Sequence, residues 1–469
     1  MIGIAQLMVV LDTTVVNIAL PSAQDALGFS DSDRQWVVTA YALAFGSLLL
    51  LGGRIADLFG RRRTFLIGLA GFAIASAVGG AAGSFEILVA ARAVQGVFGA
   101  LLAPAALSLL TTTFTDSKER AKAFGVYGAI AGSGAAVGLL LGGVLTEYLS
   151  WRWCMYVNLV FALAAFIGGW LLIRERPAPE RARLDVPGVL LVSTGLFGVV
   201  YGFSHAETAG WSDALTVSML AIGAALLVAF VAWQRRAANP VLPLRVVLDR
   251  NRGGSNIAMF TASMGMFALF LFLTYYLQGA LGMSAVRSGL AFLPMTAAIM
   301  IAAQIGTQVL TSRVGPRYIV APGMLLAALG MTLLTLLEPG SSYLVDVLPA
   351  TVIFGFGVGL TFSSAMNGAT AGVDPADAGS ASATVNAGQQ VGGSIGTALL
   401  NTIVASAVAD YIASHPQAPS LALDATVHSF TVGFGWAALI LAIGGFVTAA
   451  VLRGDVTAPD PDAAPTVHM

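Results

Sequence analysis

Apolar segments long enough to cross a bilayer follow one another along the whole chain. A transmembrane helix needs about 20 mostly apolar residues, because each residue advances the helix by about 1.5 Å through a hydrocarbon core about 30 Å thick. Such segments occupy residues 2–21, 35–53, 64–83, 86–110, 123–146, 153–173, 186–205, 214–234, 254–278, 289–311, 317–337, 346–371, 385–409 and 430–452. The pattern predicts an all-α membrane protein with 14 transmembrane helices.

The first apolar segment has no basic residue before it. A secretory signal peptide carries basic residues ahead of an apolar core of about 7–15 residues. We therefore expect residues 2–21 to form the first transmembrane helix, with a short or missing segment before it.

The basic residues test the helix count independently, because cytoplasmic loops of membrane proteins are rich in Lys and Arg. If the N-terminus is cytoplasmic, 19 of the 23 basic residues fall in inner loops or the tail, three fall in outer loops, and Arg92 lies inside a helix. The outer three are Arg34, Arg152 and Arg287. The asymmetry predicts that both termini are cytoplasmic, although the expected inner loop at 374–377 has no basic residue.

Composition agrees with a membrane protein and excludes several other classes. Hydrophobic residues make up 57% of the chain and charged residues only 10%, against about 25% charged residues in soluble proteins. The net charge of −1 offers no basic surface for nucleic acid, and the single Cys154 excludes an internal disulfide. The sequence GGSIG lies within an apolar helical segment, which is the wrong setting for a nucleophilic serine turn. The histidines, His205, His415, His428 and His468, are scattered, so we expect no enzyme activity, metal or cofactor.

Two distant segments share a glycine pattern that indicates an internal repeat. The fifth and thirteenth segments carry glycine at every fourth residue with one further glycine beside the series: Gly134, Gly138, Gly142 and Gly143 in the fifth, and Gly388, Gly392, Gly396 and Gly393 in the thirteenth. The loop RIADLFGRRR has a weaker counterpart in VLTSRVGPRY. Parallel repeats of this kind occur in transporters, with the substrate path between the halves. We predict six-helix halves at 1–185 and 237–453, two additional helices at 186–236 between them, and a cytoplasmic tail at 454–469.

Several ordered motifs together resemble the major facilitator superfamily, and specifically its fourteen-helix drug:proton antiporter family. LDTTVVNIALP is similar to that family's first-helix motif, and RAVQGVFGA resembles its fourth-helix motif. GAAVGLLLGG resembles the antiporter motif with Leu139 in place of proline, and WRWCMYVN matches the tryptophan-rich start of the sixth helix, with Val160 where proline is usual. GGRIADLFGRRR matches the superfamily's loop motif through Gly53, Asp57, Gly60, Arg61 and Arg62. The resemblance implies a multi-pass protein of the bacterial inner membrane that exports drugs in exchange for protons.

Asp12 is the one acid well inside a predicted span. A charge at the bilayer centre costs at least about 2.5–3.5 kcal/mol, and burial favours the neutral form of a carboxyl group. A side chain with two accessible charge states is suited to proton exchange. The alternative is a structural carboxyl group that hydrogen-bonds to a neighbouring helix. Helical periodicity places Asp12 on an apolar face, which would suit a lipophilic cation, and places Asn17 on a separate polar stripe.

Arg92 is the one basic residue deep in a predicted helix, and Gln95 shares its face. Because a guanidinium group stays protonated, Arg92 must act on a nearby acid or bind carbonyl groups. The resemblance implies a part in proton coupling with Asp12; a buried structural anchor is the alternative. For the loop motif the resemblance implies a cytoplasmic latch, although topology alone explains its arginines.

The second half contributes neutral amides, Asn367, Asn386, Gln389 and Gln390, on the twelfth and thirteenth helices. We predict that these side chains line a substrate cavity together with Asp12, Asn17 and Gln95; hydrogen bonding between helices is the alternative. The resulting hypothesis is a proton-coupled exporter of amphipathic, often cationic compounds, acting as a monomer among membrane lipids. A dedicated exporter of one metabolite or antibiotic, a passive facilitator, and a non-transporting membrane sensor are the alternatives.

Overall fold

The computed structural model describes residues 1–30, 33–113, 130, 134, 137–173, 185–237, 240–242, 244–310, 313–370, 373, 378–415 and 421–454. These residues form helices and contain no β-strand. The first-half helices are α1 (Ile2–Leu27), α2 (Gln35–Phe59), α3 (Arg61–Gly80), α4 (Phe85–Thr113) and α6 (Trp153–Leu172). They are followed by α7 (Val186–Ala209), α8 (Ala214–Gln234), α9 (Leu244–Val247), α10 (Arg250–Tyr275), η1 (Tyr276–Ala280), α11 (Ala285–Ala291), α12 (Leu293–Gln304), η2 (Ile305–Leu310), α13 (Arg317–Leu334), η3 (Tyr343–Val347), α14 (Leu348–Thr370), α15 (Ala378–Ser414) and α16 (Leu421–Val451).

The predicted all-α membrane architecture is confirmed. Thirteen helices in the described part of the chain are long and apolar enough to cross a bilayer, and Val137–Tyr148 adds a shorter apolar helix. That shorter helix is the described end of the predicted fifth span; the rest of the span, apart from Ile130 and Gly134, lies outside the described residues. The last helix begins at Leu421, before the predicted apolar span at 430–452.

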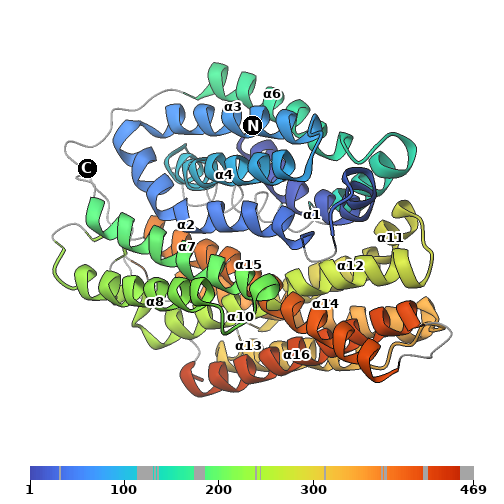
Figure 1. Ribbon diagram of the computed structural model, residues 1–469. Helices are drawn as coiled ribbons and strands as arrows, with labels where there is room; N and C mark the ends of the chain where they lie inside the picture. Colours follow the sequence, from blue (N-terminus) through green and yellow to red (C-terminus); the bar gives the residue numbers. More distant parts are fainter. Residues whose placement is uncertain are drawn as a thin grey trace, which may run out of the picture.

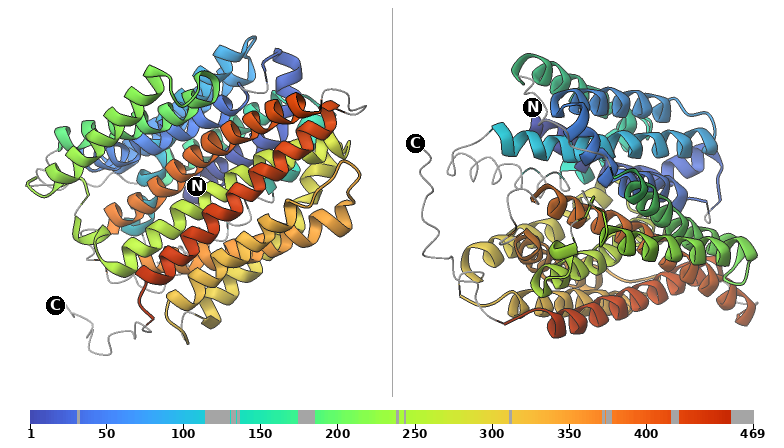
Figure 2. Two further views of the ribbon diagram at one scale, coloured as in Figure 1. Left: turned by 60° about the horizontal axis from the view of Figure 1, so that its bottom comes forward. Right: turned by 90° about the vertical axis from the view of Figure 1, so that its left-hand side faces the viewer.

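The helices form two groups with a helix pair beside them. In Figure 1, α1 to α4 and α6, coloured blue to teal, lie above α10 to α16, coloured yellow-green to red. The α7–α8 pair, in green, lies along one side of both groups, as the second view of Figure 2 also shows. Helix α7 packs against α8, against α2 of the first group and against α15 of the second. The pair therefore bridges the two groups.

Acidic side chains fix the starts of several helices after the first half. The carboxylate of Asp185 accepts a hydrogen bond from the Gly188 amide at the start of α7. Asp213 accepts from the Leu215 and Thr216 amides at the start of α8. Such caps satisfy amide groups that have no partner within the helix, and the negative charge is favourable at a helix N-terminus.

The two groups pack against each other through α2 and α15, and further contacts join them at one end of the bundle. We call the end at which α1 begins the Ile2 end, and the other the Leu27 end. Near the Leu27 end, the Gln278 amide donates to the Ile18 carbonyl over 3.3 Å, and the Tyr275 hydroxyl donates to the Gln24 side chain over 2.7 Å. The guanidinium of Arg34 lies 4.0 Å from the centre of the Tyr275 ring. These contacts join α1 and the start of α2 to the end of α10.

Candidate functional site

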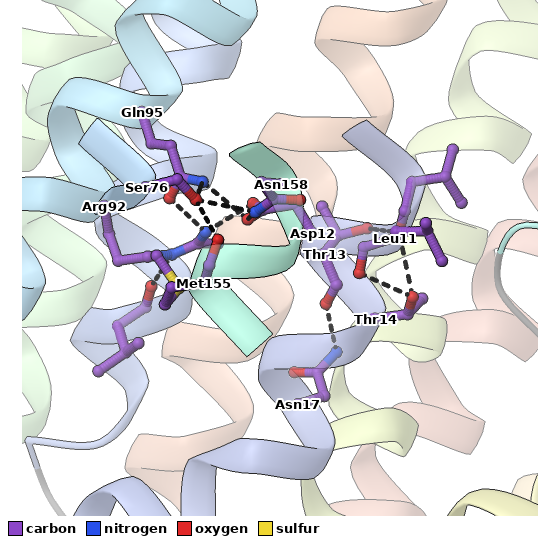
Figure 3. A network of polar contacts seen from close by, with 12 residues as sticks. Leu11, Asp12, Thr13, Thr14, Asn17, Ser76, Arg92, Gln95, Met155 and Asn158 are labelled. Atoms are coloured by element: carbon purple, nitrogen blue, oxygen red, sulfur yellow. Dashed lines mark hydrogen bonds and ion pairs between the residues drawn. The ribbon is translucent and has the colours of Figure 1, made fainter. Parts of the chain in front are cut away.

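Asp12 lies at the centre of a buried polar network formed by α1, α3, α4 and α6 (Figure 3). Its side chain is 0% exposed and accepts hydrogen bonds from three residues on two other helices. Arg92 donates to Oδ2 over 2.6 Å, while Gln95 and Asn158 each donate to Oδ1 over 2.7 Å. All three bonds place N–H donors on carboxylate oxygens, which is the arrangement that an ionised carboxyl group requires.

Ser76 supports this network from α3. Its hydroxyl oxygen accepts from Gln95 over 3.0 Å and from Asn158 over 2.9 Å. The same hydroxyl donates to the Met155 carbonyl on α6 over 2.9 Å. Both amides that bind Asp12 are therefore also held by one serine, which fixes their orientation.

Arg92 is held on several sides within the first half. It is 1% exposed, and its Nε donates to the Val37 carbonyl on α2 over 3.1 Å. Its Nη1 also donates to the Gln95 side chain over 2.8 Å, and its guanidinium lies 4.4 Å from the centre of the Tyr41 ring. Removing one member of a buried ion pair typically costs about 3–5 kcal/mol, because the other charge is left without a partner. The site thus couples the charge of Asp12 to the packing of α1, α2 and α4.

Local sequence explains how these side chains converge. Arg92 and Gln95 are three residues apart, so α4 presents both on one face. On α1, Met8 and Val15 share the face of Asp12 and are fully buried. In this conformation the apolar face of α1 is therefore buried: Met8 belongs to a core of mostly first-half residues, and Val15 to a core formed by both halves.

The predicted cavity residues are not all brought together. Gln95 joins the Asp12 network, whereas the Asn17 amide donates to the Thr13 carbonyl of its own helix over 3.0 Å. Asn367 is an exposed residue of α14, and Asn386, Gln389 and Gln390 are partly buried on α15. Of these, Gln390 lies against Gly46 of α2. A role in substrate binding stays a prediction for each of these residues.

The loop motif joins α2 to α3 through Gly60, whose φ of 96° lies in the region that glycine adopts most easily. Arg62 donates to the Trp170 carbonyl on α6 over 2.8 Å, and its guanidinium lies 5.1 Å from the centre of the Trp170 ring. Arg61 begins α3, and Gly53 lies within α2. The Asp57 side chain lies outside the described residues, so the predicted latch stays a prediction.

The glycine motif of the fifth span packs against α1 and the second half. A Cβ added at Gly134 would lie 3.0 Å from the Val10 side chain, and one at Gly138 would collide with the Thr14 hydroxyl. A Cβ at Gly142 would lie 3.1 Å from the Val15 backbone. Gly143 faces the other half, where a Cβ would lie 2.8 Å from the Ala285 carbonyl of α11. These glycines permit the close approach of two helices.

Sequence reasoning missed Ser76, Tyr41 and Asn158 as parts of the site. Asn158 ends the WRWCMYVN motif, and a polar amide inside an apolar span was the available signal. The sequence carried no such signal for Ser76 and Tyr41, because single serines and tyrosines are common in membrane helices.

Two groups of membrane-length helices, with a buried ion pair inside the first, define the class of this protein: a multi-pass membrane transporter. The chain belongs to the Major Facilitator Superfamily, whose sequence model matches residues 2–397.

Antibiotic resistance and export proteins are among the similar sequences. The puromycin resistance protein pur8 of Streptomyces alboniger is 53% identical over 450 residues, covering 96% of this chain and 88% of that protein. The cephamycin export protein CmcT of Amycolatopsis lactamdurans is 40% identical over 405 residues, covering 86% and 83%. The tetracenomycin C resistance and export protein of Streptomyces glaucescens is 35% identical over 415 residues, covering 87% and 76%.

Solved transporter structures share the fold. A bacterial homologue of the human lysosomal transporter Spinster superposes with a TM-score of 0.65 at 16% identity and 96% coverage of both chains. An auto-inhibited peptide transporter of the POT family gives 0.69 at 17% identity and 98% coverage of both chains. At such identities the likeness concerns the fold alone.

Proposed function

We propose that this protein exports amphipathic small molecules, antibiotics among them, from a bacterial cell in exchange for protons. The observation that carries the proposal is the fully buried pair of Asp12 and Arg92, since an intramembrane ion pair is a costly feature that typically serves ion or proton movement. The protein's relatives described above are named for antibiotic resistance and export. The proposed substrate class rests on those relatives, and the proposed proton coupling rests on the buried ion pair.

The proposed orientation places the Ile2 end and both termini on the cytoplasmic side of the inner membrane. The distribution of basic residues supports it, because 19 of 23 then lie on the cytoplasmic side or in the tail. With this orientation the contacts of Tyr275 with Gln24 and Arg34 lie on the outer side. The structure then corresponds to a conformation that is closed to the outside.

Proton exchange would act through the hydrogen bonds of Asp12. With the carboxylate ionised, three donors hold α1 against α4 and α6. A proton on Asp12 removes the charge that Arg92 balances and replaces one acceptor with a donor, so the network must rearrange. Alternating access would follow if the outward-open conformation favours the protonated form and substrate favours the ionised one. The cycle uses the proton gradient and needs no cofactor or catalytic residue, and a single chain suffices for it.

A dedicated self-resistance pump for one antibiotic is the second candidate. The specific observation in its favour is 53% identity to a puromycin resistance protein over 96% of this chain. A passive facilitator or a non-transporting sensor would have no need for the Asp12–Arg92 pair.

The test is transport into inverted membrane vesicles with an acidic interior, using puromycin and the cationic dye ethidium. Gradient-driven accumulation by the parent and its loss in Asp12→Asn supports antiport. Asp213→Asn is the matched control, because it makes the same chemical change at a partly exposed helix cap where asparagine also caps well. Accumulation of puromycin alone favours the dedicated pump, and accumulation that Asp12→Asn leaves intact contradicts proton coupling.

A further inference from the structure

The side-chain amide of Asn158 lies beside Asp12, and only one end of it is hydrogen-bonded among the described residues. It is 0% exposed, and its amide nitrogen donates to both Asp12 and Ser76. Its carbonyl oxygen is buried and has no hydrogen-bond partner in the part of the chain that the structure describes. Buried carbonyl oxygens nearly always have a partner, so an exception at a polar site calls for an explanation.

The position of Asn158 is fixed by the tryptophan-rich motif at the start of α6. Arg152 donates to the Gly80 carbonyl over 2.9 Å and to the Ala82 carbonyl over 2.5 Å, which ties α6 to the end of α3. Ser76 on α3 then donates to the Met155 carbonyl one turn before Asn158. The motif therefore sets the register in which α6 delivers an amide to Asp12.

We propose that Asn158 is a positioning residue that stabilises both charge states of Asp12 during proton exchange, an inference that rests on the function proposed above. With Asp12 ionised, the amide nitrogen of Asn158 donates to the carboxylate. When a proton adds to a carboxylate oxygen, Asp12 gains an O–H donor and no other covalent bond changes. A half-turn of the Asn158 amide then presents its carbonyl oxygen as the acceptor for that O–H.

The neighbouring polar groups are not free to accept a hydrogen bond from protonated Asp12. The Gln95 carbonyl oxygen already accepts from Arg92, so turning that amide would break a bond to the guanidinium. The Ser76 hydroxyl already accepts twice and donates once. The charged and titratable side chains that face Asp12 in the described part of the chain are Arg92 from α4 and Tyr41 from α2, whereas α3 and α6 present Ser76 and Asn158.

The test compares Asn158→Leu, which keeps the branched shape of the side chain without polar atoms, with the parent in inverted vesicles that have an acidic interior and are supplied with puromycin or ethidium from outside. We expect gradient-driven accumulation to fall by about tenfold or more, the factor for one lost hydrogen bond to a charged group, while exchange without a gradient is retained. Both forms of Asp12 lose a partner, but the hydrogen bond to the ionised carboxylate is the stronger of the two, so the pH at which export is half-maximal moves upward. Asn158→Ser, whose hydroxyl both donates and accepts, restores part of the coupled transport.

Asn256→Leu on α10 is the matched control. Among the described residues, the Asn256 amide nitrogen donates only to the Arg252 carbonyl of its own helix, and its carbonyl oxygen also has no partner. Coupled accumulation and an unchanged pH profile in Asn158→Leu would overturn the inference and leave the proposed function intact. A parent that never accumulates either compound against a gradient would overturn both. If Asn158→Leu does not fold, Ser76→Ala is tested instead. This variant removes the hydroxyl that holds the Asn158 amide, so an unchanged pH profile of export would contradict the proposal.

Discussion

The guanidinium of Arg92 and the carboxylate of Asp12 lie 2.6 Å apart, although 80 residues separate them in the sequence. Both side chains are fully enclosed by the first half. The pair ties α1 to α4, and through the Val37 carbonyl it also ties both to α2. A change in the charge of Asp12 therefore acts on the packing of three helices at once.

Arg92→Lys keeps the positive charge but not the geometry. A lysine cannot reproduce the separate bonds of Arg92 to Asp12, Gln95 and the Val37 carbonyl, because it lacks the planar fork of donors. We expect coupled export to fall by about tenfold to a hundredfold, which corresponds to the loss of one or two hydrogen bonds to charged groups. Initial export rates in inverted vesicles measure this effect. Arg235→Lys, at an exposed position after α8, is the control, and full activity of Arg92→Lys would show that charge alone suffices.

Gly143→Ala tests the contact between the fifth span and α11. A Cβ at Gly143 would lie 2.8 Å from the Ala285 carbonyl and 2.9 Å from the Val286 Cα, and backbone atoms yield little. We expect the variant to disfavour the conformation described here and to unfold at a lower temperature. The matched control is Gly388→Ala on α15, where an added Cβ meets nothing within 4 Å. Alanine there should leave thermal stability equal or raise it by up to about 1 kcal/mol through helix propensity. Equal melting temperatures for both variants would contradict the argument.

The sequence predicted the helices far better than the site. Membrane spans follow from hydropathy, so their number and order were accessible from a single chain. The limits appear at the helix ends: residues 421–429 include Asp424 and His428, yet α16 begins at Leu421 because a helix continues beyond the apolar core. Hydropathy marks that core and not the end of the hydrogen-bonded helix.

Single members of the site were predictable, but their contacts were not. Asp12 and Arg92 stand out because charge is rare in an apolar span, whereas their contact depends on how α1 and α4 cross. Asn158 and Ser76 are ordinary polar residues in the sequence. Only the packing of α3 against α6 shows that they complete the network.

Asp213 gives a prediction about pH outside the membrane. Hydrogen bonds from the Thr216 and Leu215 amides, together with the nearby His205, lower the pKa of the Asp213 carboxyl group below its ordinary value of 3.8. A depressed pKa contributes stability that is present above the ordinary value and is lost as pH falls through the lower folded value. We expect the melting temperature of Asp213→Asn to vary less with pH than that of the parent below about pH 4. Parallel pH profiles for both proteins would contradict this expectation.

The interface between α2 and α15 gives the last prediction. The Asn401 amide donates to Gln35, and Gln390 lies against Gly46, so the two helices run in opposite directions with the same spacing between contacts. Thr39, one turn from Gln35, is therefore level with Thr397, one turn from Asn401. Both threonine side chains are buried, and neither hydroxyl has a hydrogen-bond partner among the described residues. An unpartnered buried hydroxyl costs about 1–3 kcal/mol, and valine of the same shape removes that cost. We expect the double variant, Thr39→Val with Thr397→Val, to melt at a higher temperature because this conformation is stabilised. We also expect it to export more slowly, because opening the halves to the outside no longer gains the hydration of two hydroxyl groups.

Thr402→Val is the control. The Thr402 hydroxyl donates to the Ala398 carbonyl over 2.8 Å, so the same change removes a hydrogen bond and should not stabilise the protein. A double variant that melts earlier than the parent, or exports faster, would show that the hydroxyls are satisfied in the closed interface.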